Sequence, residues 1–231
     1  MSANIPDLSV FKKFNFTRSV VGVKFSFAKP DGITKLSKKI RLCAMITEAQ
    51  TCDSPFYVNK DNEECGMGGS WVMGWLDIPP ECSSGGVGII DGTYRESRAN
   101  RRIYDYIPML TKGTINYLTF SSLAKLSFDP DLLIIMTDND SQAEIIFRAA
   151  SYTNGNLLVS KMTQVIGCAW LYVYPYKTGK INYMNTGLFY GPGKRYKIFP
   201  TDRQIISIPF DWLPLITQNL KEMPWVLPEF K

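Results

Sequence analysis

Apolar and polar residues recur along the chain in two periods, which predicts a protein of mixed strands and helices. Short runs of β-branched and aromatic residues indicate strands. The run LLIIM at 132–136 is wholly apolar, as expected for a strand buried on both faces. The predicted strands are 20–27, 56–60, 115–123, 132–138, 156–162, about 196–200 and 205–210.

Helices are predicted between these strands. The segment 36–50 has apolar residues at helical spacing, and they fall on one face. Those residues are Leu42, Met45, Ile46 and Ala49. Ser141 and Glu144 predict a capping box for a helix that ends near Asn154. Further helices are expected just after residue 69, within 92–110 and near 211–222, with a loop over 77–88.

This order of elements predicts an α/β or α+β fold in which helices cover mixed sheets, in a single compact domain over residues 1–231. Segments 20–75 and 132–174 share the order strand, helix, strand and a cysteine before an aromatic run. The shared order suggests two similar halves around a pseudo-two-fold axis. Cys65 and Cys168 would then face one cleft from opposite sides.

Composition narrows the chemistry that the chain can perform. Its 231 residues are 45% hydrophobic and 20% charged, the net charge is +5, and histidine is absent. Without histidine there is no Ser-His-Asp or Cys-His machinery and no imidazole ligand. A general base must therefore be a carboxylate, Lys, Tyr or Cys, and a soft metal must be held by sulfur.

The apolar runs, the cysteines and the charge also indicate where the protein is located and which partners it has. The apolar runs are too short to cross a bilayer and the first residues lack a secretory core, so we expect a cytoplasmic protein without a membrane partner. Five scattered cysteines favour reduced thiols over a disulfide framework. The modest charge disfavours nucleic acid. Basic groups at 36–42, 95–102 and 193–197 suit an anionic small molecule. A homodimer is the base-rate expectation.

The stretch CGMGG at 65–69 is the main candidate binding site. Its glycines would let a ligand approach the backbone closely, and Cys65 would present its sulfur beside free N–H groups. A free cysteine is also a small core residue, so the packing interpretation stays open.

Seven motifs follow one another along the chain: VGVKF (21–25), RLCAMITEA (41–49), CGMGG (65–69), PP…SGG (79–86), FDPDLLIIMTDNDSQAEIIFRAA (128–150), CAWLYVYPYKTGKINYMNTG (168–187) and ISIPFDWLPLITQNL (206–220). Together they resemble the domain-of-unknown-function family 169, found mainly in archaea and anaerobic bacteria, over about residues 18–222. Cys43, Cys65 and Cys168 fall where the family pattern carries cysteine, whereas Cys52 and Cys82 do not. The resemblance implies an architecture but brings no settled activity with it.

These features predict a cytosolic binding protein of anaerobic metabolism that holds an anionic, aromatic cofactor. A metal-bearing tetrapyrrole is the first candidate and an iron–sulfur cluster the second. The candidate metal ligands are Cys43, Cys65 and Cys168. The candidate cofactor-binding residues are Cys65, Gly66, Met67, Gly68, Gly69, Trp71, Cys168, Trp170, Tyr174, Arg98 and Arg102. The aromatic rings would stack on the cofactor and the arginines would neutralise its carboxylates.

Two other functions remain open. A cysteine-dependent enzyme acting on a small anionic substrate would need a thiol activated by lysine or by a glycine-rich loop. A structural or regulatory partner protein would have only an incidental cleft. The aromatic residues also suit an ordinary core.

Overall fold

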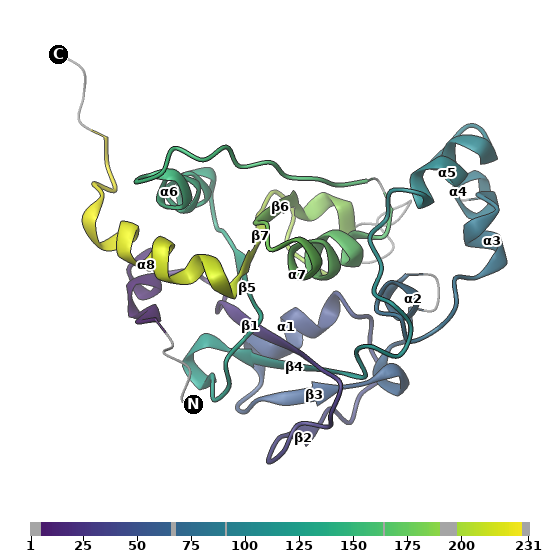
Figure 1. Ribbon diagram of the computed structural model, residues 1–231, viewed down its shortest axis with the longest axis horizontal. Helices are drawn as coiled ribbons and strands as arrows, with labels where there is room; N and C mark the ends of the chain where they lie inside the picture. Colours follow the sequence, from purple (N-terminus) through teal and green to yellow (C-terminus); the bar gives the residue numbers. More distant parts are fainter. Residues whose placement is uncertain (1–5, 66–67, 91, 164, 190–197, 228–231) are drawn as a thin grey trace.

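A seven-stranded mixed sheet runs through the protein (Figure 1). The computed structural model describes residues 6–65, 68–90, 92–163, 165–189 and 198–227. The strand order is β2-β3-β4-β1-β5-β7-β6, and each neighbouring pair is antiparallel except the parallel pair β2–β3. The strands are β1 (Val21–Ser26), β2 (Thr34–Lys35), β3 (Phe56–Val58), β4 (Tyr117–Ser122), β5 (Leu132–Met136), β6 (Asn182–Asn185) and β7 (Gln204–Pro209).

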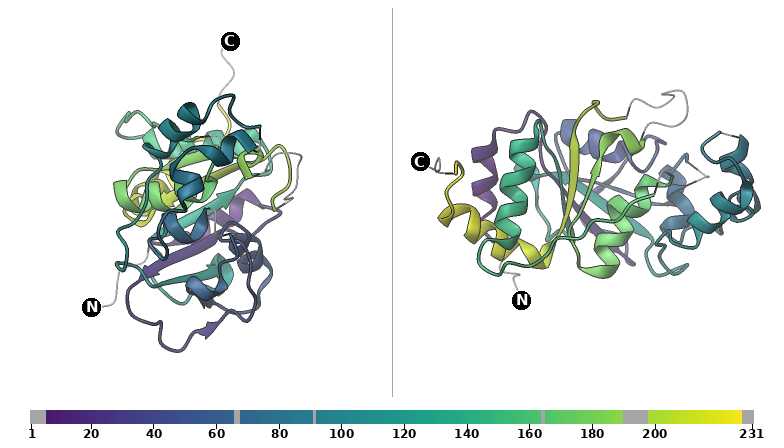
Figure 2. Two further views of the ribbon diagram at one scale, coloured as in Figure 1. Left: turned by 90° about the vertical axis from the view of Figure 1, so that its right-hand side faces the viewer. Right: turned by 90° about the horizontal axis from the view of Figure 1, so that it is seen from above.

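Helices cover both faces of this sheet (Figures 1 and 2). The α-helices are α1 (Ala44–Thr51), α2 (Gly69–Val72), α3 (Pro80–Ser83), α4 (Gly86–Ile90), α5 (Ser97–Tyr104), α6 (Asp140–Ser151), α7 (Tyr174–Thr178) and α8 (Leu213–Glu222). The 3-10 helices are η1 (Leu8–Phe14), η2 (Lys60–Asn62), η3 (Leu123–Lys125), η5 (Thr186–Phe189) and η7 (Phe210–Trp212), and η4 (Ala169–Val173) is a π-helix. No helix in the described ranges is long and apolar enough to cross a membrane.

Strand β5 lies between two hydrophobic cores. Leu132, Ile134 and Met136 point into a first core with α1, α2 and η4, while Leu133 and Ile135 point into a second core with α6, α8 and η1. Because alternate side chains of a strand face opposite sides of the sheet, both sides of β5 must be apolar. The predicted α/β class, with a mixed sheet in one compact domain, is confirmed.

The two segments of the suggested repeat meet in the middle of the sheet. Strands β1 and β5 are antiparallel neighbours, with Val23 opposite Leu132. Helix α1 follows β1 into the first core, whereas α6 follows β5 into the second. The helices of the two segments therefore lie on opposite faces of the sheet, and the internal duplication stays a prediction.

The loop predicted over 77–88 is wrong, because this segment forms α3 and α4. Together with α5 these helices make a lobe at one end of the molecule (Figure 2). Pro80 begins α3, where the missing N–H of proline has no helical partner to lose. Gly85, at φ +82°, reverses the chain before α4, and a Cβ there would lie 2.2 Å from the carbonyl oxygen of Ser97. The proline and glycine residues that predicted a loop instead begin and separate two short helices.

The strand predicted over 156–162 is also wrong, because this segment is extended but joins no sheet. Its backbone bonds to a side chain: the Lys161 N–H donates to Asn182 Oδ1 at 2.8 Å, and Asn182 Nδ2 donates to the Lys161 carbonyl at 3.0 Å. Leu157 is 86% exposed, whereas the neighbouring Leu158 packs half-buried against the second core. Of the strand expected near 196–200, residues 198–200 are irregular and the remainder lies outside the described residues.

Two helix starts differ from the predictions. Helix α1 begins at Ala44 and not near residue 36, although its predicted apolar face is buried as expected. Helix α6 is capped by Asn139, whose side chain accepts a hydrogen bond from the Gln142 N–H at 3.0 Å, and not by Ser141. Asn and Ser cap helices equally well, so the sequence alone does not choose between neighbouring cap residues.

Candidate functional site

Three cysteines that lie far apart in the sequence converge on one face of the sheet. Cys43 precedes α1, Cys65 lies shortly before α2, and Cys168 precedes η4. The Cys168 thiol is hydrogen-bonded to Cys43, and Cys65 is close enough to interact electrostatically with both. We call Cys43, Cys65 and Cys168 the cysteine cluster. These are the three cysteines that the resemblance singled out.

The loop before α1 brings the first two cysteines together. Ile40 and Glu63 form a parallel β-bridge, and the Ile40 N–H donates to the Asn62 carbonyl at 2.9 Å. The buried Asn62 side chain also donates to the carbonyls of Leu36 and Lys38, at 2.7 and 2.9 Å. The segment after Ile40 therefore runs beside the segment after Glu63, which places Cys43 near Cys65.

Glu63 is buried at the centre of this arrangement, with 5% of its surface exposed. The Cys65 N–H donates to its Oε1 at 2.6 Å, while its Oε2 is buried without a hydrogen-bond partner. Burial raises the pKa of Glu63 to about 7, although backbone N–H groups and Arg41 partly oppose this rise. A carboxyl group with a pKa near neutrality can exchange a proton at physiological pH.

Gly69 allows the Glu63 carboxylate to lie where it does. A Cβ at residue 69 would be 2.5 Å from Glu63 Oε2, closer than any real contact. The Gly69 N–H also donates to the Cys65 sulfur, an interaction that favours the thiolate. Within the predicted glycine run, Gly69 therefore contacts both the Cys65 sulfur and the Glu63 carboxylate. Gly66 and Met67 of the same run lie outside the described residues.

Cys65 is the most accessible member of the cluster, because it is half-buried while Cys43 and Cys168 are each 7% exposed. Arg41 Nη1 lies 4.0 Å from the Cys65 sulfur, and Arg41 Nε lies 3.7 Å from Glu64 Oε1. Burial nevertheless raises the pKa of the Cys65 thiol above its ordinary value, with Gly69 and Arg41 opposing the rise. Cys65 is therefore a protonated thiol at neutral pH in the ligand-free protein.

Behind Cys65 the site becomes fully buried. The hydrogen bond from Cys168 to Cys43, together with burial, holds the pKa of the Cys168 thiol well above its ordinary value. Tyr172 donates to the Leu42 carbonyl at 3.1 Å, and burial raises the pKa of this phenol as well. Both groups are neutral at pH 7.

The spacing of these groups limits metal binding. In the part of the chain that the structure describes, no group of three or more His, Cys, Asp or Glu side chains is arranged to hold a metal ion. The three sulfur atoms of the cysteine cluster, of which those of Cys43 and Cys168 are in contact, are thus not arranged as a closed three-ligand set. A ligand that needs one sulfur fits this arrangement better than one that needs three or four.

The predicted aromatic residues lie in the first core beside the cluster. Trp71, Trp170 and Tyr174 are all buried. Trp170 and Tyr174 have ring centroids 5.8 Å apart, and Trp170 Nε1 donates to Thr163 Oγ1 at 2.8 Å. These rings are therefore packed within the first core, and the indole N–H of Trp170 is satisfied.

The predicted arginines belong to the lobe and not to the cluster. Arg98 Nε lies 2.5 Å from Glu96 Oε2, and Arg102 donates to the Tyr106 hydroxyl at 3.4 Å. Both interactions are local to α5 and its ends. The cation that the structure brings to the cysteines is Arg41, which sequence reasoning missed along with Glu63. The sequence signal that could have found them is their spacing. Arg41 stands two residues before Cys43, and Glu63 stands two residues before Cys65.

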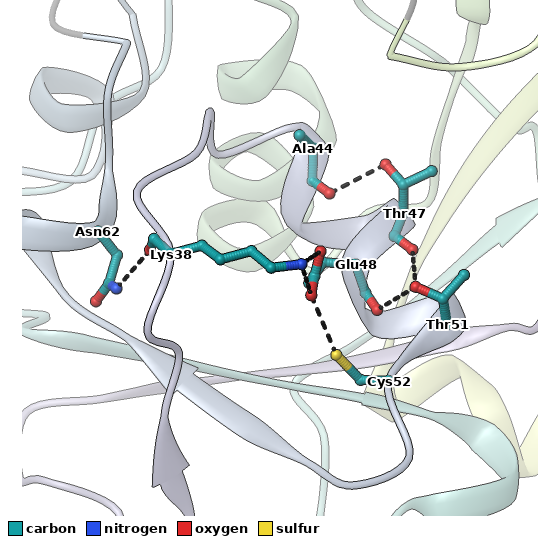
Figure 3. Close-up of polar contacts among 7 residues, drawn as sticks. All are labelled: Lys38, Ala44, Thr47, Glu48, Thr51, Cys52 and Asn62. Atoms are coloured by element: carbon teal, nitrogen blue, oxygen red, sulfur yellow. Dashed lines mark hydrogen bonds and ion pairs between the residues drawn. The ribbon is translucent and has the colours of Figure 1, made fainter.

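The remaining cysteines lie apart from the cluster. Cys52 ends α1, at the opposite end from Cys43, and its thiol donates to Glu48 Oε1 at 3.4 Å (Figure 3). Lys38 also donates to Glu48, at 2.8 and 3.0 Å (Figure 3). Cys82 is buried in α3, within the lobe. Cys52 and Cys82 are therefore natural controls for experiments on the cluster.

Comparison with known proteins identifies the chain only at the level of a family. The family model DUF169, described as "Uncharacterised ArCR", matches residues 11–219. No curated protein and no solved structure matches the chain.

Proposed function

The chain belongs to the DUF169 family, and we propose that it is a binding protein for an anionic, aromatic cofactor held at the cysteine cluster. The observation that carries the proposal is the approach of the half-buried Cys65 sulfur to the Arg41 guanidinium, at 4.0 Å. A sulfur and a cation at one place suit a ligand that combines a soft centre with negative charge. Cys43 and Cys168 lie behind Cys65 and line the same site.

A metal-bearing tetrapyrrole is the cofactor class that we favour, because it needs one axial sulfur from the protein. Cys65 would supply that sulfur, Arg41 would offset the cofactor's carboxylates, and the glycines at 66 and 68 would let it approach the backbone. Trp71 and Trp170 would form the aromatic wall behind it. An iron–sulfur cluster ranks lower, because the described residues offer no three-ligand set.

The proposal includes a location and an assembly. None of the five cysteines forms a disulfide, which supports placing the protein in the reducing cytoplasm. The partner is then a small molecule, with neither nucleic acid nor a membrane required. A homodimer remains the expected assembly on base rates.

The first test is an anaerobic absorption spectrum of the protein purified from its native source, with metal analysis of the same sample. We expect sharp visible bands and bound nickel, iron or cobalt. Cys65→Ser should lose both, while the matched control Cys52→Ser should keep them. A featureless spectrum without metal in the unaltered protein would refute the cofactor proposal.

One observation favours a second candidate, a cysteine-dependent enzyme acting on a small anionic substrate. Glu63 lies against Cys65 with an unpartnered Oε2 and a pKa of about 7, which suits a general base in a protein without histidine. The raised pKa of the Cys65 thiol ranks this candidate second, since the thiolate is the nucleophile. Rapid alkylation of Cys65 alone at pH 7, faster than that of free cysteine, would reverse the ranking.

A further inference from the structure

A cavity lies on the face of the sheet opposite the cysteine cluster. It is bounded by η1, by the chain from Asn15 to Val20 and by η3. In Figure 1, η1 is the purple helix beside α8. The cavity has a volume of about 490 Å³, which is typical of small-molecule sites, since these range over roughly 300–1,000 Å³. The apolar side chains that line it are Leu8, Phe11, Phe16, Val20, Leu123 and Leu126. We call this cavity the N-terminal groove.

The floor of the groove is part of the second core. Phe11 and Val20 are buried, and Leu8, Phe16 and Leu123 pack half-buried against the same core. One wall of the groove is η1, and this helix is capped at both ends. Asp7 accepts a hydrogen bond from the Ser9 N–H at 3.0 Å, and Asn15 ends the helix in the left-handed conformation. The apolar surface is therefore preformed, which lowers the entropic cost of binding.

Charge on the groove has one sign. Lys12 and Arg18 are among the lining residues, and no carboxylate is. Two acidic side chains of adjoining segments are engaged elsewhere: Asp7 pairs with Lys221 at 3.0 Å, and Asp138 accepts from the Thr17 N–H at 2.7 Å. Arg18 is oriented by a hydrogen bond to Gln50 Oε1 at 3.2 Å. An apolar trough with two cations is complementary to an apolar chain that ends in an anion.

We infer that the N-terminal groove binds a free, medium-chain fatty acid. The acyl chain lies on Phe11, Val20 and Leu123, and the carboxylate meets Lys12 and Arg18. The site is independent of the cysteine cluster, because its residues belong to the second core and those of the cluster to the first.

Calorimetric titration of the full chain with dodecanoate, kept below its micellar concentration, tests this inference. We expect saturation at one equivalent. Each buried methylene contributes about fourfold in affinity, so decanoate, which is two methylenes shorter, should bind roughly fifteenfold more weakly. Dodecyltrimethylammonium has the same chain length and the opposite charge, and it should bind at least tenfold more weakly than dodecanoate.

Variants locate the ligand. Lys12→Gln combined with Arg18→Gln should weaken dodecanoate binding at least tenfold, whereas the matched control Lys39→Gln, at an exposed lysine outside the groove, should leave it unchanged. Ala124→Trp places a bulky ring at an exposed groove position and should abolish binding while circular dichroism stays unaltered.

Three results would overturn the inference. The first is no saturable binding by the full chain, or binding that the cationic detergent matches. The second is binding only after residues 1–5 are removed, which would make the chain's own first residues the occupant. The third is a dimer in light scattering that Ala124→Trp dissociates, which would make a second copy the occupant.

Discussion

Glu63 combines three properties at one residue: it is buried, one of its oxygens has no partner, and its other oxygen accepts the Cys65 N–H. Unpartnered polar atoms in a protein interior are rare, and they call for a functional or energetic explanation. The pKa of Glu63 rises from its ordinary value of 4.5 to about 7. Glu63 therefore affects stability as well as chemistry.

We predict that the ligand-free protein loses stability as the pH rises from about 4.5 to 7. Folded Glu63 holds its proton up to a higher pH than unfolded Glu63, so the folded state binds more protons in this window and the free energy of unfolding falls. The shift corresponds to roughly 3 kcal/mol. Glu63→Gln, which is always neutral, should remove this fall and be more stable than the unaltered protein at pH 8.

Urea unfolding at pH 5 and pH 8 measures this difference. The matched control is Glu64→Gln at the more exposed neighbour, which should keep the fall in stability. If the free energy of unfolding falls equally between pH 5 and pH 8 in the unaltered protein and in Glu63→Gln, the pH dependence belongs to other groups.

Gly69 shows how closely the site is packed. A Cβ at this residue would lie 2.5 Å from Glu63 Oε2, so Gly69→Ala must displace the carboxylate. We expect a loss of about 1–3 kcal/mol in the free energy of unfolding, as for other overpacked sites. Gly86→Ala is the control, because its Cβ would meet nothing closer than 3.5 Å. If chemical denaturation finds the two variants equally stable, the close packing of Gly69 on Glu63 is wrong.

Much of the element order could be predicted from the sequence because it depends on local periodicity. The wholly apolar β5 and the apolar face of α1 both follow from spacing alone. The start of α1 did not follow, because residues 36–43 bond to β3 and to Asn62, which are distant in the chain. The segment 156–162 has strand-like composition and lies beside the edge strand β6, but it is joined to β6 through the side chains of Ser160 and Asn182 and not through a backbone ladder. Local composition thus failed where a distant partner decided the structure.

Asn182 replaces the missing strand pairing. This buried side chain accepts from the Lys161 N–H and donates to the carbonyls of Lys161 and Trp170, the last at 2.9 Å. We predict that Asn182→Ala lowers the free energy of unfolding by about 2–4 kcal/mol, because several buried partners lose their hydrogen bonds together. Hydrogen exchange at the Lys161 amide should quicken as well.

Asn185→Ala is the matched control in the same strand, β6, where the side chain is exposed and accepts from the nearby Gly187 N–H. It should change stability by less than about 1 kcal/mol and leave Lys161 exchange unaltered. Unchanged exchange at Lys161 in Asn182→Ala would show that another group holds the 156–162 segment.

At the scale of the whole molecule, the sheet separates two possible ligand sites. The cysteine cluster borders the first core, and the N-terminal groove borders the second. The sequence pointed to the three cysteines through their family pattern, but not to Arg41 and Glu63 beside them. The N-terminal groove had no signal of its own, because its walls come from η1 and η3, which are about 110 residues apart in the sequence. Such a surface exists only after the sheet has assembled.

Tyr172 joins the C-terminal part of the site to the N-terminal part. Its hydroxyl donates to the Leu42 carbonyl at 3.1 Å, across 130 residues of sequence, and its ring packs edge-on against Phe120 with centroids 6.1 Å apart. Cys43 adjoins Leu42, and Cys168 lies one helical turn before Tyr172. The hydrogen bond therefore helps to keep Cys43 against Cys168.

We predict that Tyr172→Phe removes one of the two hydrogen bonds that the buried Leu42 carbonyl accepts, since the Met45 N–H still donates to it at 3.2 Å. The free energy of unfolding should fall by about 0.5–1.5 kcal/mol. The cluster should open more often, so Cys43 and Cys168 should react faster with iodoacetamide under native conditions, whereas Cys82 in the lobe should keep its rate. Mass spectrometry of pulse-labelled protein measures both rates. Tyr183→Phe, at a more exposed ring, controls for loss of a hydroxyl. A uniform increase at all three cysteines would indicate global destabilisation and contradict a specific link through Tyr172.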